Sequence, residues 1–191
     1  MKRLISIILA LLALAQVRAA LPARLQKAAD RLGSAPAVKA TFTTADGSPG
    51  VMTLCGHMFL LVVPGAQMSY DGATQWALSE ADEELTLVTP TADELAQCNP
   101  LLLLQTAGSR FQAAEEGLTY RLTPRRDDGS IDFCIIRFAS ASAPWPSEMT
   151  LSTGGNQISL TNLKFTELPS ALPAAHFRIK APQGVYINDL R

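Results

Sequence analysis

The sequence has few of the residues that usually mark a catalytic or metal site. Its 191 residues include two histidines and three cysteines, and the motifs His-Glu-x-x-His, Cys-x-x-Cys and Gly-x-Ser-x-Gly do not occur. It also lacks a phosphate-binding loop and a dinucleotide fingerprint. Cys55 and His57 alternate onto one face of a strand, but two ligands do not make a metal site. We therefore expect a protein that is not an enzyme and that holds no metal and no cofactor.

Charge is also scarce. Charged residues make up 17% of the chain and the formal net charge is -1, whereas about 25% is usual for a soluble domain. Without a basic excess the protein has no general attraction for phosphates, so we do not expect a nucleic-acid partner. The hydrophobic fraction of 48% is too high for a disordered chain. The length is typical of one domain with a sizeable core.

The first residues have the pattern of an export signal. Lys2 and Arg3 precede an apolar run from Leu4 to Leu14, and Val17-Arg18-Ala19 offers a cleavage site. The run is too short for an ordinary transmembrane span, and an uncut membrane anchor is the alternative. We expect residues 1–19 to be a signal peptide and residues 20–191 to form a single exported domain. Removal of the signal lowers the basic residues from 16 to 13 against 17 acids, a formal charge of -4.

The periodicity of the mature chain predicts one helix followed by many strands. Apolar residues recur at helical spacing over 22–32, between Pro22 and Gly33. Short Val-, Thr- and Phe-rich stretches separated by turns such as Asp46-Gly47 then indicate an antiparallel meander. The expected strands are 37–45, 50–55, 58–63, 67–71, 74–79, 84–89, 109–114, 118–124, 131–138, 147–153, 157–165 and 175–180.

A helical interruption is expected at 91–106. The pattern Thr91-Ala-Asp-Glu94 is typical of a capping box, and Asn99-Pro100 is typical of the start of a second helix. Four successive leucines, Leu101 to Leu104, cover every side of that helix, so one buried face does not explain them.

The expected strand 58–63 is apolar on both alternating faces, so both sides of its sheet must be covered. A barrel around an apolar ligand and a two-layer sandwich both satisfy this pattern. The acidic residues at 80 and 82–84 are interpreted as a solvated loop. Arg121, Arg125 and Arg126 are interpreted as solvated or ion-paired, with a docking patch as the alternative.

Four segments resemble the LolA family of periplasmic lipoprotein carriers. The ending Ala174–Asp189, with Phe177-x-Ile179 and Pro182-x-Gly184-Val185, is similar to the end of that family. Asp71-Gly72-x-x-x-Trp76 resembles its hairpin before the central helices, Asn99-Pro100-Leu101 the helix that follows, and Lys39–Thr43 its first strand. Their order agrees over nearly the whole mature chain.

The resemblance implies an incomplete, strongly curved antiparallel β-barrel of about 11 strands, with an N-terminal helix and a helical lid. It implies a periplasmic protein that binds the acyl chains of lipoproteins in a hydrophobic cavity. The implied partners are acylated lipoproteins, an inner-membrane ABC transporter and an outer-membrane acceptor, and we expect a monomer. Many family members have an Arg-Pro pair where this sequence has Cys55-Gly56, so we assign no residue that latches the lid.

We expect the cavity and lid surface to come from the doubly apolar strands, the hairpin and the leucine helix. These candidate acyl-binding residues are Met52, Leu54, Phe59, Leu61, Trp76, Leu101, Leu102 and Leu104. Plain core positions are the alternative for each of them. Two other functions stay open: a binding protein of the same fold for another lipid or amphiphile, and a degraded hydrolase or interaction domain with a filled core. The state of Cys55, Cys98 and Cys134 is also open.

Overall fold

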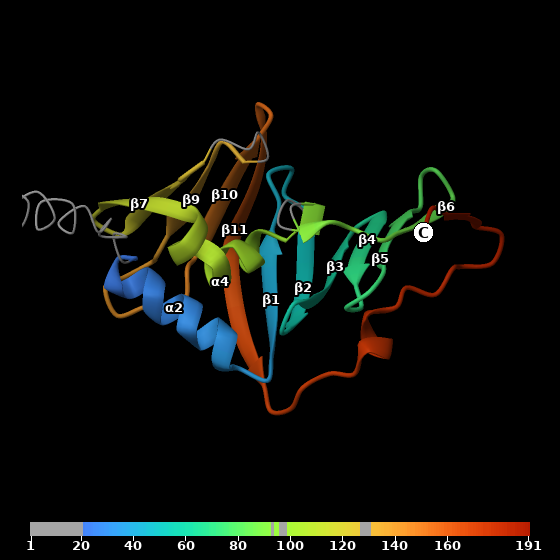
Figure 1. Cartoon of the computed structure of the whole chain (residues 1–191), viewed down its shortest axis with the longest axis horizontal. Helices are drawn as coiled ribbons and strands as arrows, with labels where there is room; N and C mark the ends of the chain where they lie inside the picture. The colour runs from blue at the N-terminus through green and yellow to red at the C-terminus, as the bar shows by residue number, and fades with distance from the viewer. Residues whose placement is uncertain (1–20, 93, 96–98, 127–130) are drawn as a thin grey trace, which may run out of the picture.

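The fold is one large, open, curved sheet with helices on one side (Figure 1). A computed structural model describes residues 21–92, 94–95, 99–126 and 131–191; the expected signal peptide lies outside these residues. The strands are β1 (Ala37–Thr43), β2 (Pro49–Cys55), β3 (Met58–Val63), β4 (Ala66–Tyr70), β5 (Gln75–Ser79), β6 (Glu84–Val88), β7 (Phe111–Glu116), β8 (Thr119–Pro124), β9 (Phe133–Arg137), β10 (Glu148–Thr153), β11 (Asn156–Leu168) and β12 (Tyr186–Asp189).

The twelve strands form one sheet in the order β12-β6-β5-β4-β3-β2-β1-β11-β10-β9-β8-β7. All neighbours pair antiparallel except β12, which lies parallel to β6. The long strand β11 pairs with both β1 and β10, and so joins the two halves of the chain. The predicted incomplete curved barrel with helices is therefore confirmed, with twelve strands in place of about eleven.

The predicted strand at 175–180 is wrong. Residues Ala174–Phe177 form a short 3-10 helix, η1, and the last strand, β12, begins only at Tyr186. The apolar residues Phe177 and Ile179 alternate as they would in a strand. They are instead buried against the face of the sheet without joining its ladder.

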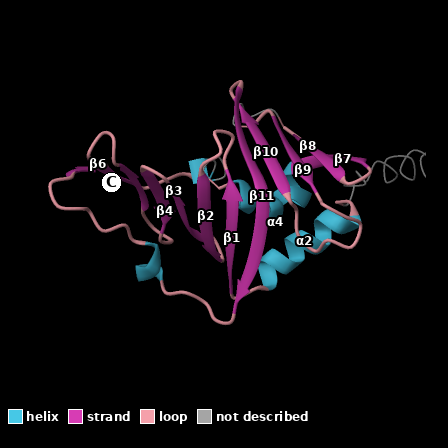
Figure 2. Cartoon of the chain, turned by 180° about the vertical axis from the view of Figure 1, so that it is seen from behind, coloured by secondary structure: helices cyan, strands magenta, loops and turns pink. Residues whose placement is uncertain are grey.

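Helices α2 (Ala23–Ser34) and α4 (Pro100–Arg110) pack against each other on one side of the sheet (Figure 2). The predicted helix at 22–32 is confirmed as α2, which buries Leu25, Ala28, Ala29 and Leu32. With the inward side chains of β1, β2 and β8–β11, the two helices form the main core. This core occupies the half of the sheet around β1 and β11 and reaches β3 at Phe59.

The sequence signals for the helix starts are also confirmed. The Thr91 backbone N–H donates to Glu94 Oε2 at 2.7 Å, and the Glu94 N–H donates to Thr91 Oγ1 at 3.3 Å, which is a capping box. The Leu101 N–H donates to Asn99 Oδ1 at 3.1 Å, which caps the start of α4. Asn99 is fully buried, so its side chain replaces water at the helix end.

The outer face of β3–β6, on the side away from the helices, is covered by the C-terminal segment that precedes β12, residues 169–185. Ile179 packs with Leu78, Leu85 and Leu87 in a second apolar cluster. Phe177 packs with Ala37 and Cys55 in a third. The two faces of β3 therefore have different neighbours, because Leu60 joins these outer clusters while Phe59 belongs to the main core.

Candidate functional site

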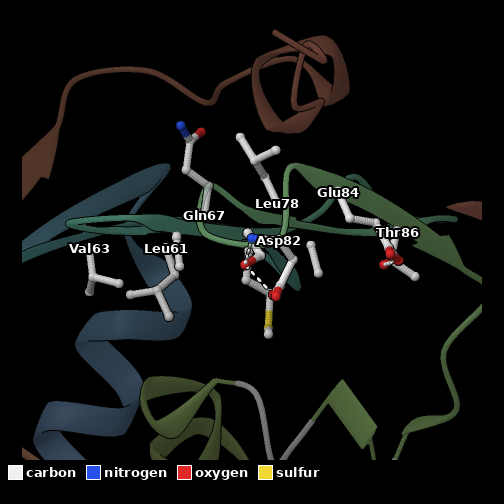
Figure 3. A pocket seen from close by; sticks show the side chains of 11 residues that line it. Leu61, Val63, Gln67, Leu78, Asp82, Glu84 and Thr86 are labelled. Carbon is white, nitrogen blue, oxygen red and sulfur yellow. Dashed lines mark hydrogen bonds between the residues drawn. The ribbon is translucent and has the colours of Figure 1, made fainter. Parts of the chain in front are cut away.

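A pocket of about 360 Å³ lies on the helix-bearing face of β3–β6, beside the main core (Figure 3). Figure 3 shows that Leu61 and Val63 point into this side, toward the helices. Gln67 and Leu78 point the other way, toward the C-terminal segment. The lining residues are Leu61, Val63, Ala66, Gln67, Met68, Ala77, Leu78, Ser79, Asp82, Glu84 and Thr86.

The register of the sheet explains why these residues meet. Residues directly opposite each other on paired strands point to the same face. The pocket floor therefore consists of two cross-strand ladders that run from β3 to β6. The first ladder is Leu61, Met68, Ala77 and Thr86, and the second is Val63, Ala66, Ser79 and Glu84.

Each ladder changes from apolar to polar as it crosses the sheet. The β3 end carries a leucine and a valine, and the β6 end carries a threonine and a glutamate. Two alanines, Ala66 and Ala77, occupy the middle, where their small side chains leave space above the sheet. The pocket is therefore an amphipathic groove with its apolar end next to the core.

Two carboxylates border the pocket, Glu84 at its β6 end and the exposed Asp82 nearer its middle (Figure 3). Glu84 Oε1 accepts hydrogen bonds from Thr86 Oγ1 at 2.7 Å and from Asn188 Nδ2 of β12 at 3.0 Å. Asp82 Oδ2 accepts from Ser79 Oγ at 2.6 Å. The hydrogen bonds from Asn188 and Thr86 hold the pKa of Glu84 below its ordinary value, although burial and the charge of Asp82 act in the opposite direction. Glu84 is therefore ionised at neutral pH.

The structure separates the eight candidate acyl-binding residues. Leu61 lines the pocket. Trp76 lies on the outer face of β5 with the cluster around Ile179, and the side chain of Leu102 is outside the described residues. The members of the main core, each at most 3% exposed, are Met52, Leu54, Phe59, Leu101 and Leu104. Only one described candidate therefore borders the empty space.

Sequence reasoning misses most of the pocket. The candidates do not include Val63, Ala66, Met68 or Ala77, and the acidic residues Asp82 and Glu84 are interpreted there as part of a solvated loop. One sequence signal could have found these residues. Alternate residues of a strand share a face, so the face of Leu61 can be followed across three successive hairpins to Thr86.

Neither histidine and neither described cysteine enters the pocket lining. Cys55 and Cys134 are buried free thiols, and Cys98 lies outside the described residues. The Cys55 thiol lies 3.3 Å from the Pro36 carbonyl oxygen, and the Leu172 N–H donates to its sulfur at 3.4 Å. Burial raises the pKa of the Cys134 thiol to about 12. Within the described residues no group of three or more metal-ligating side chains occurs.

No helix in the described part of the chain combines the length and the apolar character needed to cross a bilayer.

Comparison with known proteins gives a shared fold at low sequence identity. No family model and no curated protein matches the sequence. An uncharacterized conserved protein from Thermus thermophilus is similar over 86% of this chain and 98% of its own, with 12% identity and a TM-score of 0.50. LprF from Mycobacterium bovis is similar over 85% of this chain and 95% of its own, with 12% identity and a TM-score of 0.33. The first likeness covers most of this chain and shows that the two proteins share a fold.

Proposed function

We propose that the protein binds the acyl chain of an amphiphile in the pocket on the helix-bearing face of β3–β6. The observation that supports this most is an apolar space left open beside a well-packed core. A groove of about 360 Å³ floored by Leu61, Met68 and Ala77 leaves apolar surface open beside the core, and such concave apolar surface is typical of ligand-binding sites. Pockets that bind small molecules usually fall in this size range.

The size of the pocket sets the size of the ligand. A cavity of about 150 Å³ holds a benzene ring, so about 360 Å³ gives room for about 14 carbon atoms. Each fully buried methylene contributes about 0.8 kcal/mol, so about 14 of them set an upper limit on the order of 11 kcal/mol before the costs of binding, and a chain in an open groove gains less. Escape of such a chain into water is slow, which favours direct transfer between binding sites.

The resemblance to the LolA family extends this proposal to a cargo and a route. The protein would carry acylated lipoproteins through the periplasm, from an inner-membrane ABC transporter to an outer-membrane acceptor, as a monomer and without a catalysed step. A lipoprotein with two or three acyl chains needs more room than the described pocket offers. The volume therefore favours the second candidate, a carrier of the same fold for a single-chain lipid or amphiphile.

A pair of neighbouring substitutions tests whether the pocket is the binding site. Val63 lines the pocket, whereas Val62 points to the other face and is 36% exposed. Val63→Asp places a carboxylate beside the chain, and we expect at least about tenfold weaker binding, because an unpaired charge in apolar surroundings is costly. Val62→Asp is the matched control and should bind normally.

The measurement is calorimetry of the full chain with dodecyl maltoside, a nonionic single-chain ligand, below its micellar concentration. Normal binding by the folded Val63→Asp variant would place the site elsewhere. The cargo is tested separately by isolating the protein from an envelope extract and identifying bound molecules by mass spectrometry. Intact acylated lipoproteins would support the lipoprotein carrier, and single-chain lipids alone would support the second candidate.

A further inference from the structure

The polarity of the pocket has a direction. Both floor ladders begin with large apolar side chains on β3 and end with hydrogen-bonding groups on β6. In Figure 3 Leu61 and Val63 lie at one end of the pocket, and Glu84 and Thr86 lie at the other. The binding free energy of an amphiphile is most favourable when its chain lies over β3 and β4 and its head group lies at β6.

The charge at the head-group end is of one sign. The eleven lining residues include two carboxylates, Asp82 and Glu84, and no lysine or arginine. Asp82, Glu80 and Glu83 all belong to the β5–β6 connection and are exposed, whereas Glu84 is half-buried. The guanidinium of Arg191, which follows β12, is paired with the Asp189 carboxylate.

Both carboxylates of the lining accept hydrogen bonds from neighbouring side chains. Ser79 donates to Asp82, and Thr86 and Asn188 donate to Glu84. Asn188 belongs to β12, so the parallel pairing of the last strand with β6 helps to position Glu84. Both acceptors retain free lone pairs for a ligand, since a carboxylate can accept more hydrogen bonds than these.

We infer that the pocket selects amphiphiles with a cationic head group, a protonated amine or a quaternary ammonium, over those with an anionic one. This inference rests on the proposed acyl-chain binding in the same pocket. The chain lies along Leu61 and Val63, and the positive head group lies between Asp82 and Glu84. An anionic head group at the same depth would face two carboxylates without a counter-charge in the lining.

The experiment compares three ligands with one chain and different head groups: dodecyltrimethylammonium, dodecyl maltoside and dodecyl sulfate. Affinities are measured by calorimetry on the full chain at low salt, below the micellar concentrations. We expect the cationic ligand to bind at least about tenfold more tightly than the anionic one. The ratio should fall toward one in about 1 M salt, where charges are screened beyond about 3 Å.

Two variants separate the effect of the pocket carboxylates on the affinity ratio from the effect of the protein's net charge. In the double variant Asp82→Asn with Glu84→Gln the ratio should fall toward one, and an unchanged circular dichroism spectrum should show that the variant is folded. Glu116→Gln changes the net charge at the opposite edge of the sheet, on β7, and should leave the ratio as it is.

The outcomes distinguish the inference from the proposed function. Equal binding of all three dodecyl ligands would overturn the head-group inference and leave acyl-chain binding intact. A preference that survives in the double variant would assign the effect to the whole protein and also overturn it. Failure of every dodecyl ligand to bind would overturn both.

Discussion

The length of chain that the pocket accepts is a prediction that a single substitution should change. Ala77 lies in the middle of the first floor ladder, between Met68 of β4 and Thr86 of β6, and its methyl group faces the space above the sheet. Ala77→Phe fills that space with an aromatic ring. Phenylalanine is a favoured strand residue and Ala77 is only half-buried, so we expect the variant to fold.

The expected loss of binding free energy follows from the volumes of the pocket and of the added ring. An aromatic ring occupies about 150 Å³ of cavity, which leaves about 210 Å³ of the original 360 Å³. By the same scale the room for the ligand falls from about 14 carbon atoms to about 8. The loss for a long chain is about six methylenes, or about 5 kcal/mol before relaxation of the pocket.

The assay is the affinity of an alkyl maltoside series from octyl to hexadecyl, measured by calorimetry. For the unchanged protein the affinity should rise about fourfold per methylene and level off near 14 carbons. For Ala77→Phe the plateau should begin near 8 carbons. Val62→Phe, which adds a ring on the exposed opposite face, should leave the plateau unchanged. A plateau at the same length in Ala77→Phe and the unchanged protein would refute the assignment of the chain to this pocket.

Two further predictions concern stability. Gly50→Ala should lower the free energy of unfolding by about 1–3 kcal/mol in urea titrations, because the added Cβ would lie 2.1 Å from the Phe42 ring. Gly33→Ala is the control, because no atom lies within 4 Å of the Cβ it adds. It should be neutral or stabilising by up to about 1 kcal/mol. The second concerns Asp71, which is 8% exposed and accepts a hydrogen bond from Arg178 at 2.9 Å. Burial raises its pKa, but the backbone donors of the Asp71 turn and Arg178 together bring it below the ordinary value. The ionised form therefore stabilises the fold at neutral pH, and this contribution is lost as the pH falls through the lowered pKa. Asp71→Asn should then be less stable than the unchanged protein at pH 7, with the difference shrinking on acidification below about pH 4; a difference independent of pH would contradict this.

Much of the fold could be predicted from the sequence, because turns and alternation are local signals. The short strands between Gly-containing turns, the capping box at Thr91 and the cap at Asn99 all form as expected. The segment after Pro173 could not be predicted in the same way. Its apolar residues alternate like those of a strand, but whether they pair with a neighbour or pack on the face of a sheet depends on distant parts of the chain.

The site was harder to predict because the sequence does not show which face of a strand points inward. In β5 the large apolar residues Trp76 and Leu78 share one face, and Ala77 lies on the other. The usual rule assigns the large residues to the interior side of a barrel. In this protein the C-terminal segment buries them on the outer face, so the helix-bearing face holds the small and polar residues that leave a pocket.

On β5 and β6 the buried leucines and the pocket floor lie on opposite faces, whereas Leu61, Val63 and Met68 of the floor also pack against the main core. Leu78, Leu85 and Leu87 are at most 4% exposed under Ile179 of the C-terminal segment, so β5 and β6 gain their hydrophobic stabilisation from the outer cluster. The helix-bearing face of β5 and β6 can therefore remain partly uncovered, because the outer cluster supplies the free energy that keeps these strands folded. The β5–β6 part of the proposed binding pocket can therefore empty and refill without disturbing the contacts that bury these leucines on the outer face.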